Sequence, residues 1–299
     1  MYWNSLNDRL REQYGTKVYK LALSSGCSCP NRDGTLGNRG CIFCDGAGAF
    51  AAAGTISDQL TQAKNRVAAK AGSEARYIAY FQSFTNTYGP VEQLRTLYAA
   101  AMEPEEVVAL SIATRPDCLG PDVLELLKEL NQRKPVWVEL GLQTIHPETA
   151  AYIRRGYDLP VYDEAVARLR ELGITVVTHQ ILGLPGETAD MIAETALYIG
   201  QSGADGVKFH LLHVLEGTDL AADWRAGRFQ TMSLNEYILA LEECVRRIPR
   251  EMVIHRLTGD GAKRDLLAPL WSGDKKRVLN AIHQAFARDD VEQGSALRK

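Results

Sequence analysis

The sequence has 299 residues, of which 45% are hydrophobic and 24% are charged, and its formal net charge is −3. This ordinary globular composition favours one large domain with small extensions over two equal domains. The longest apolar runs, such as 99–102 and 136–142, are too short to span a bilayer, and the polar N-terminal segment lacks the apolar stretch of a secretory signal. We therefore expect a cytoplasmic protein without a membrane-spanning segment.

Strand-like and helix-like segments alternate along almost the whole chain. Short β-rich runs predict strands at 17–23, 76–81, 107–113, 136–142, 174–182, 206–211 and 252–256. Amphipathic spacing and capping residues predict helices at 57–71, 90–102, 121–133, 147–155, 160–172, 188–201, 218–226, 233–247 and 275–288.

This alternation predicts parallel βαβ units. Six or seven repeats without a Gly-x-Gly-x-x-Gly turn favour an α/β fold, a partial or near-complete (β/α) barrel, over a dinucleotide-binding sheet. We divide the chain into an N-terminal helical extension at 1–16, the barrel core at 17–250, and a basic extension at 251–299 that completes or caps the barrel. In such barrels the chemistry takes place at the C-terminal ends of the strands.

Four of the six cysteines crowd the loop after the first predicted strand: Cys27, Cys29, Cys41 and Cys44. In a cytosolic chain such a group indicates metal or redox chemistry rather than disulfides. The Cys-x-x-Cys pair and a third thiolate would hold three corners of an iron–sulfur cube and leave the fourth iron open. A four-thiolate zinc site is the alternative, although the single residue between Cys27 and Cys29 is tight for zinc geometry.

The surrounding motifs are longer and more specific. The strings CPNRDGT at 29–35 and GNRGCIFC at 37–44 resemble the YhcC/YtqA-type branch of the radical S-adenosylmethionine (SAM) superfamily, which is related to the radical SAM domain of the Elongator catalytic subunit. The resemblance runs from YGTKVY at 14–19 to LLAPLW at 266–271 and so covers nearly the whole chain. It implies a barrel of the radical SAM type and a [4Fe–4S] cluster on Cys29, Cys41 and Cys44, with Cys27 a spare thiol.

The resemblance also implies S-adenosyl-L-methionine as the second cofactor. In this superfamily SAM chelates the open iron, the reduced cluster donates one electron, and the resulting 5′-deoxyadenosyl radical abstracts a hydrogen atom from an unactivated carbon. An electron donor such as flavodoxin or ferredoxin is then expected as a partner.

Residues at later strand ends match the family's SAM contacts. By resemblance, the cofactor-binding residues are Phe43, Tyr80, Phe81, Gln82, Glu139, Gln143, Arg155, His179 and Gly183. His179 stands where relatives often carry a ribose-binding Asp. Taken alone, Phe81 also suits a buried core, His179 a hydrogen-bonded core group, and Arg155 the exposed end of a helix.

A second polar group is our candidate for the substrate side: Cys118, Lys208, His210, His255 and Arg256, with His213 and the segment 258–261 nearby. Lys208 and His210 alternate onto one face of a strand, which in a barrel can be the interior. At a barrel mouth Cys118 could offer a hydrogen atom or a proton. Arg115 and Asp117 either position a substrate or pair with each other, and a structural salt-bridge network explains the whole group equally well.

In this branch the resemblance implies tRNA maturation. The implied step converts a carboxymethylaminomethyl group on carbon 5 of the wobble uridine into an aminomethyl group. An unpaired anticodon base can be splayed into a pocket, and basic clusters at 263–264 and 275–277 would contact phosphates. Residues 244–299 hold 12 Lys or Arg against 7 Asp or Glu, which fits an anionic partner but also a solvated helical face.

Two other functions fit the residues. One is a radical SAM reaction on a small anionic metabolite, such as a porphyrin-like polycarboxylate. The other is a zinc-stapled RNA-binding or scaffold protein without catalysis. Binding of tRNA that weakens steeply as salt rises favours the RNA substrate, and a brown protein absorbing near ~400 nm indicates iron–sulfur rather than zinc.

Overall fold

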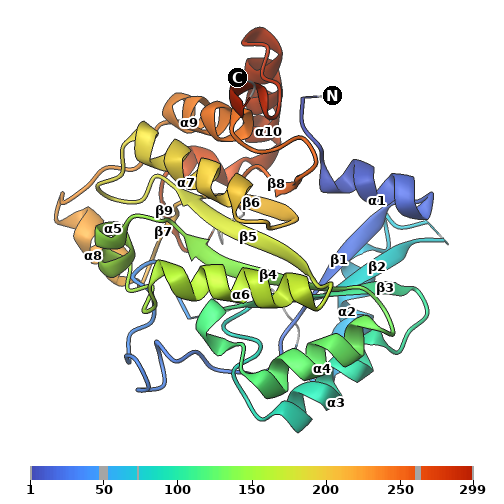
Figure 1. Ribbon diagram of the computed structural model, residues 1–299. Helices are drawn as coiled ribbons and strands as arrows, with labels where there is room; N and C mark the ends of the chain where they lie inside the picture. Colours follow the sequence, from blue (N-terminus) through green and yellow to red (C-terminus); the bar gives the residue numbers. More distant parts are fainter. Residues whose placement is uncertain (1, 47–52, 73, 260–263, 298–299) are drawn as a thin grey trace.

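The computed structural model describes residues 2–46, 53–72, 74–259 and 264–297. Its centre is a seven-stranded sheet that curls into an open barrel (Figure 1). In spatial order the strands are β1 (Val18–Leu23), β2 (Arg76–Phe81), β3 (Val107–Thr114), β4 (Val136–Gln143), β5 (Thr175–Leu182), β6 (Gly206–Leu211) and β8 (Val253–Arg256). All neighbouring pairs are parallel, which places their C-terminal ends together at one end of the barrel.

Helices cover the outer face of the sheet. They are α2 (Ile56–Val67), α3 (Val91–Met102), α4 (Pro121–Asn131), α6 (Leu159–Glu171), α7 (Ala189–Gln201) and α9 (Leu234–Arg246), with α1 (Leu6–Tyr14), α5 (Pro147–Tyr152), α8 (Asp219–Arg225) and α10 (Lys275–Arg288) around them. Local sequence sets their starts. At α9, for example, the Ser233 hydroxyl accepts a hydrogen bond from the Glu236 amide, and the Glu236 carboxylate accepts one from the Ser233 amide.

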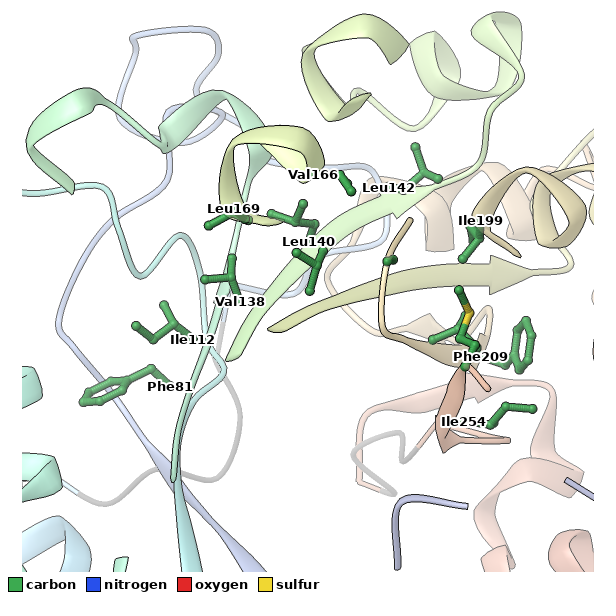
Figure 2. Close-up of a cluster of buried hydrophobic side chains, with 14 of the residues drawn as sticks. Phe81, Ile112, Val138, Leu140, Leu142, Val166, Leu169, Ile199, Phe209 and Ile254 are labelled. Carbon is green, nitrogen blue, oxygen red and sulfur yellow. The ribbon is translucent and has the colours of Figure 1, made fainter. Parts of the chain in front are cut away.

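Figure 2 shows the hydrophobic layer between the sheet and its helices. On β4, Val138 and Leu140 are fully buried and lie beside Val166 and Leu169 of α6. Burial of each such side chain stabilises the fold by about 1.5–3 kcal/mol. Because side chains alternate along a strand, the intervening Glu139 points to the inside of the curl. The outer face therefore supplies the apolar core, and the inner face carries polar groups.

The barrel does not close, because β1 and β8 are the two edges of the sheet. Helix α1 contacts both edge strands, and its N-cap Ser5 forms a parallel bridge with Ile254 of β8. Strand β8 lies inside the predicted extension at 251–299, so that extension supplies the last strand of the barrel. The prediction of a partial (β/α) barrel is confirmed.

Two elements differ from prediction near the barrel mouth. The helix expected at 147–155 ends at Tyr152, because the backbone becomes left-handed at Arg154 (φ 57°) and Gly156 (φ 82°). A small antiparallel sheet of β7 (Val214–Leu215) and β9 (Leu266–Ala268) was not predicted, since strands this short show no period-two pattern. None of the described helices combines the length and the hydrophobicity that a membrane crossing requires.

Candidate active site

A cavity of about 270 Å³ opens at the C-terminal ends of the parallel strands. It is lined by many of the predicted site residues: Cys29, Cys41, Phe43, Cys44, Tyr80, Gln82, Glu139, Gln143, Arg155, His179 and His210. A second cavity of about 230 Å³ shares Phe43, Gln143, His179 and His210 with it. Residues far apart in the sequence thus converge at the barrel end where catalysis is expected.

The cysteine loop is held at the mouth of the barrel by one apolar side chain. Ile42 is 6% exposed and packs in a hydrophobic cluster with Ile153 and Leu220. Its amide donates to the Ile153 carbonyl (3.2 Å), and its carbonyl accepts from the Leu220 amide (3.0 Å). These contacts fix the positions of Cys41 and Cys44, which flank Ile42 and Phe43 in the sequence.

Arg32 closes the loop around the thiols, a role that the sequence analysis missed. Its Nη2 donates to the Cys44 carbonyl at 2.6 Å. The guanidinium lies against Gly40 and Gly46, where a Cβ atom would come within 2.8 and 2.7 Å of it. The glycines spaced along the loop were the available signal, because only a residue without a side chain lets the guanidinium approach the backbone this closely.

Asn31 joins the same loop to the segment after α5, and it too was missed. Its Nδ2 donates to the Arg154 carbonyl (2.7 Å) and to the Cys41 sulfur (3.5 Å). A Cβ atom at Gly156 would lie 2.8 Å from Asn31 Oδ1, so this glycine makes room for the contact. A buried amide thereby orients one of the cavity thiols.

The three cavity thiols suit an iron–sulfur cube. All are free cysteines, and the pKa of Cys41 is raised to about 11, mainly by burial and in part by the neighbouring Cys44 and Cys29. Within the described residues, no three His, Cys, Asp or Glu side chains converge tightly enough to hold one metal ion. A zinc ion needs every sulfur about 2.3 Å from one centre, whereas a cube binds each thiolate at a different iron.

Cys27 does not belong to this set. It does not line the cavity, and its sulfur lies 4.0 Å from the Asn86 carbonyl and 3.5 Å from where a Cβ atom would stand at Gly89. Burial raises the pKa of its thiol. This placement agrees with the reading of Cys27 as a spare thiol.

Below the thiols, a buried carboxylate organises the interior of the barrel. Glu139 is fully buried, and its Oε1 accepts from Lys20 Nζ at 3.0 Å and from Ser111 Oγ at 2.7 Å. Its Oε2 contacts Lys208 Nζ and lies 2.9 Å from His179 Nε2. Burial alone would raise the pKa of Glu139, but the two lysines hold it well below its usual value. The carboxylate is therefore ionised and paired.

His179 is held by this carboxylate at the wall of both cavities. Burial lowers its pKa, so the imidazole is neutral at physiological pH. Its ring lies 4.9 Å from that of His210, centroid to centroid. A neutral imidazole can still exchange one hydrogen bond with a ribose hydroxyl, and its role toward SAM stays a prediction.

Arg155 is not at the exposed end of a helix. It is 4% exposed, and it donates from Nη1 to the Thr144 carbonyl (2.6 Å) and from Nε to the Tyr157 carbonyl (3.0 Å). Arg115 in turn donates to the Arg155 carbonyl at 2.7 Å and forms a two-pronged pair with Asp117. Two buried guanidinium groups thus brace the cavity wall, and Arg115 and Asp117 do pair with each other.

Gln143 reaches the cavity through a strained backbone. Its φ is 69°, a left-handed conformation that a residue with a side chain rarely adopts. Its amide folds back over Gly141, where a Cβ atom would lie only 2.8 Å from Gln143 Nε2. Glycine is therefore required at position 141 for a steric reason.

Six predicted residues lie outside the cavity lining, and the first three are Phe81, Gly183 and Cys118. The Phe81 side chain is fully buried against Tyr98 in the outer core, with ring centroids 5.1 Å apart, so only its backbone is left for a contact with SAM, which stays a prediction. Gly183 has φ 85°, and a Cβ atom there would lie 3.0 Å from Met232 Sδ. Cys118 sits in the turn after β3, 3.8 Å from Asp117 Oδ1, and its chemical role stays a prediction.

Of the substrate-side candidates, Lys208, His255 and Arg256 also lie outside the lining of the thiol cavity. Lys208 is 5% exposed and contacts Glu139 and the Tyr80 hydroxyl (3.1 Å), beneath the cavity lining. His255 and Arg256 come from the edge strand β8 and line a separate cavity of about 440 Å³ near α1 and α10. His210 is the member of this group that lines the thiol cavity itself.

Comparison with known proteins identifies the family. The pattern of the Radical SAM superfamily matches residues 34–199, and that of the Radical SAM C-terminal domain matches residues 204–288. The chain belongs to the radical SAM superfamily. As a radical SAM enzyme it uses a [4Fe–4S] cluster and SAM, and the alternative of a zinc-stapled protein without catalysis is wrong.

Two relatives match nearly the whole of this radical SAM chain, and a third matches about half of it. YtqA of Bacillus subtilis (strain 168) is 44% identical over 99% of this chain and 93% of its own, and YhcC of Escherichia coli (strain K12) is 39% identical over 98% and 95%. A tRNA uridine(34) acetyltransferase of Methanocaldococcus jannaschii is 29% identical over 51% of this chain and 28% of its own. The solved structure of Methanocaldococcus infernus Elp3 shares the fold, with a TM-score of 0.70 at 18% identity over 92% of this chain and 64% of that chain.

Proposed function

We propose that this radical SAM enzyme acts on the wobble uridine of tRNA, converting a carboxymethylaminomethyl group on carbon 5 into an aminomethyl group. The observation that carries the proposal is the single cavity in which three loop thiols face the polar interior of the barrel. The cluster and SAM together supply hydrogen-atom abstraction from an unactivated carbon. The reacting carbon must therefore reach this cavity, and a flavodoxin or ferredoxin supplies the electron.

The chain's own residues divide the work at the site. Cys29, Cys41 and Cys44 would hold three irons of the cluster. Phe43 and His179 line both adjoining cavities and suit an adenosyl group, the first by apolar contact and the second by a hydrogen bond. The apolar cluster around Ile42 lies behind Phe43 and helps to keep water from the reacting atoms.

A basic surface supports an RNA substrate. The cavity between α1, β8 and α10 is lined by Arg11, Lys17, Arg256 and Lys275, and Asp8 is the single acidic residue of its described lining. Lys275 opens the predicted basic cluster at 275–277, whereas Lys263 of the other cluster lies outside the described residues, as do positions 260 and 261. Clustered cations of this kind bind phosphates. The name of the tRNA uridine(34) acetyltransferase relative points to the same nucleotide.

Anaerobic reconstitution tests the cofactor site. We expect the brown wild-type protein to cleave SAM when reduced, and Cys29→Ala, Cys41→Ala and Cys44→Ala each to lose iron and activity. Cys27→Ala is the matched control, because Cys27 is in the same loop but outside the cavity lining. A variant without Cys41 that still binds a full cluster would contradict the ligand set.

Nucleoside mass spectrometry tests the substrate. In tRNA from a strain that lacks the gene, we expect carboxymethylaminomethyluridine to accumulate at the wobble position and its aminomethyl product to disappear. Complementation with the wild-type gene restores the product, and complementation with Cys41→Ala does not. Unchanged wobble uridines in the deletion strain would remove the tRNA proposal and leave the family membership intact.

A further inference from the structure

An exposed aromatic ring lies at the mouth of the thiol cavity. Phe84 follows strand β2, is 37% exposed, and lines this cavity. Its neighbours along the chain, by contrast, are polar and buried: Ser83, Thr85, Asn86 and Thr87. Apolar side chains normally gain stability by burial, and polar ones lose it unless they are hydrogen-bonded. This inverted arrangement leaves an apolar surface where a ligand can reach it.

The backbone at Phe84 is strained. Its φ is 62°, in the left-handed region that residues with a side chain seldom adopt. Four described residues other than glycine have a positive φ, and two of them, Phe84 and Gln143, line the thiol cavity. Strain of this kind persists only where the surrounding structure enforces it, and it concentrates at functional sites. The strain therefore indicates a role for the exposed ring.

Hydrogen bonds of the buried Asn86 hold Phe84 in this conformation. Asn86 Nδ2 donates to the carbonyls of Phe81 (3.1 Å) and Ala113 (2.8 Å). The Asn86 amide also donates to the Ala113 carbonyl (3.2 Å), and the Asn86 carbonyl accepts from the Tyr98 hydroxyl. Because these bonds tie the turn to two neighbouring strands, the ring is already in place before a ligand arrives, which lowers the entropic cost of binding.

Arg32 supports the ring from the cysteine loop. Its guanidinium carbon lies 6.0 Å from the centroid of the Phe84 ring. The guanidinium is itself fixed, because it donates to the Cys44 carbonyl and occupies the space left by Gly40 and Gly46. The ring is thus backed by a fixed side chain and keeps its exposed surface. Proteins that bind unpaired RNA use such aromatic rings to stack the planar bases.

The ring lies away from the part of the site that suits the adenosyl group. Phe43 and His179 line both adjoining cavities, whereas Phe84 lines only the thiol cavity. A planar group that stacks on Phe84 therefore does not compete with an adenosyl group held between Phe43 and His179. The ring is available to the substrate.

We propose that the Phe84 ring stacks on the nucleobase whose side chain reacts in the thiol cavity. The inference rests on the proposed function and deepens it, because the reacting group is attached to carbon 5 of a uracil ring. A base stacked at the mouth of the cavity leaves its carbon 5 substituent free to enter. The ring also replaces the stacking that the base loses when it leaves the anticodon loop.

Binding of two synthetic anticodon stem-loops tests the stacking. One carries carboxymethylaminomethyluridine at the wobble position, and the other has an abasic site there. The holoenzyme with SAM and no reductant is titrated anaerobically with each RNA, and fluorescence anisotropy gives the Kd. We expect the wild type to bind the RNA with the base about tenfold more tightly, a difference typical of one base stacked on an aromatic side chain.

Variants locate the preference at Phe84. Phe84→Leu keeps an apolar side chain without a ring, and should reduce the preference to less than about threefold while leaving the abasic RNA's Kd unchanged. Phe84→Trp keeps a ring and should retain the preference. Phe84→Gly suits the left-handed backbone, so it should fold and still lose the preference. Leu36→Ala is the control, because Leu36 is 54% exposed in the cysteine loop but outside the cavity lining, and it should leave both Kd values unchanged.

Iron content and SAM binding separate a substrate contact from a cofactor contact. Phe84→Leu should keep the wild-type iron per chain and the wild-type Kd for SAM in equilibrium dialysis, and a loss of either would assign the ring to the cofactors and overturn the inference. Equal binding of the two RNAs by the wild type, or an undiminished preference in Phe84→Leu, overturns the inference alone. Failure of the wild type to bind either RNA overturns the tRNA proposal and the inference with it.

Discussion

Replacement of Glu139 by glutamine measures how much the buried carboxylate contributes to the fold. Glutamine keeps the shape but removes the charge that pairs Lys20 and Lys208. The Lys208 side chain is 6% exposed and cannot regain water, whereas the Lys20 side chain is 23% exposed and is partly screened. Removing one partner of a buried ion pair costs about 3–5 kcal/mol of stability. Because Lys20 is partly screened by water, we expect Glu139→Gln to reduce the free energy of unfolding by about 3 kcal/mol.

Thermal unfolding of the anaerobic apoprotein reports this loss. An unfolding entropy of about 2.1 cal/mol/K per residue makes 1 kcal/mol shift the Tm of a 299-residue chain by about 1.6 °C, so we expect a fall of about 5 °C. Glu194→Gln is the control, because that carboxylate is 62% exposed and should change stability by less than about 0.5 kcal/mol. Combining Glu139→Gln with Lys208→Met should recover part of the loss. A Tm for Glu139→Gln equal to that of wild type would refute the reasoning.

Three further predictions follow from contacts around the cavity. Arg32→Gln removes the donor to the Cys44 carbonyl, so iron per chain after reconstitution should fall below about half of the wild-type value. Full iron loading would show that the Arg32 hydrogen bond is not needed to hold the cluster loop. Gly141→Ala should push aside the Gln143 amide and weaken SAM binding by roughly tenfold at unchanged iron content, measured by equilibrium dialysis; an unchanged Kd would contradict a SAM contact there. The pKa of His210 is lowered well below its usual value, so below pH ~6.5 the unfolded chain binds a proton that the folded chain does not. The free energy of unfolding should therefore decrease as the pH is lowered, by up to about 1.4 kcal/mol per pH unit. His210→Phe should reduce that slope in urea unfolding at pH 7.5 and 5.5, and an unaltered slope would place its titration elsewhere.

Local signals predicted the scaffold well. The apolar run at 136–142 corresponds to strand β4 (Val136–Gln143), because a buried parallel strand is nearly continuous in hydrophobic residues. Cys29, Cys41 and Cys44 were chosen as cluster ligands by the family resemblance, and the structure brings the three side chains to one cavity. The two readings of Phe81 could not be separated from the sequence, because successive strand residues face opposite sides and a motif alone does not say which side is inside; the structure places its side chain in the core.

By itself the sequence determined the alternation of strands and helices, the family motif and the three thiols, since all of these are encoded within short stretches of chain. Only the tertiary structure decided that Lys20 and Lys208 meet on Glu139. Those side chains come from strands far apart in the sequence. Their meeting depends on the register and curl of the whole sheet, which arise from many distant packing contacts rather than from any local pattern.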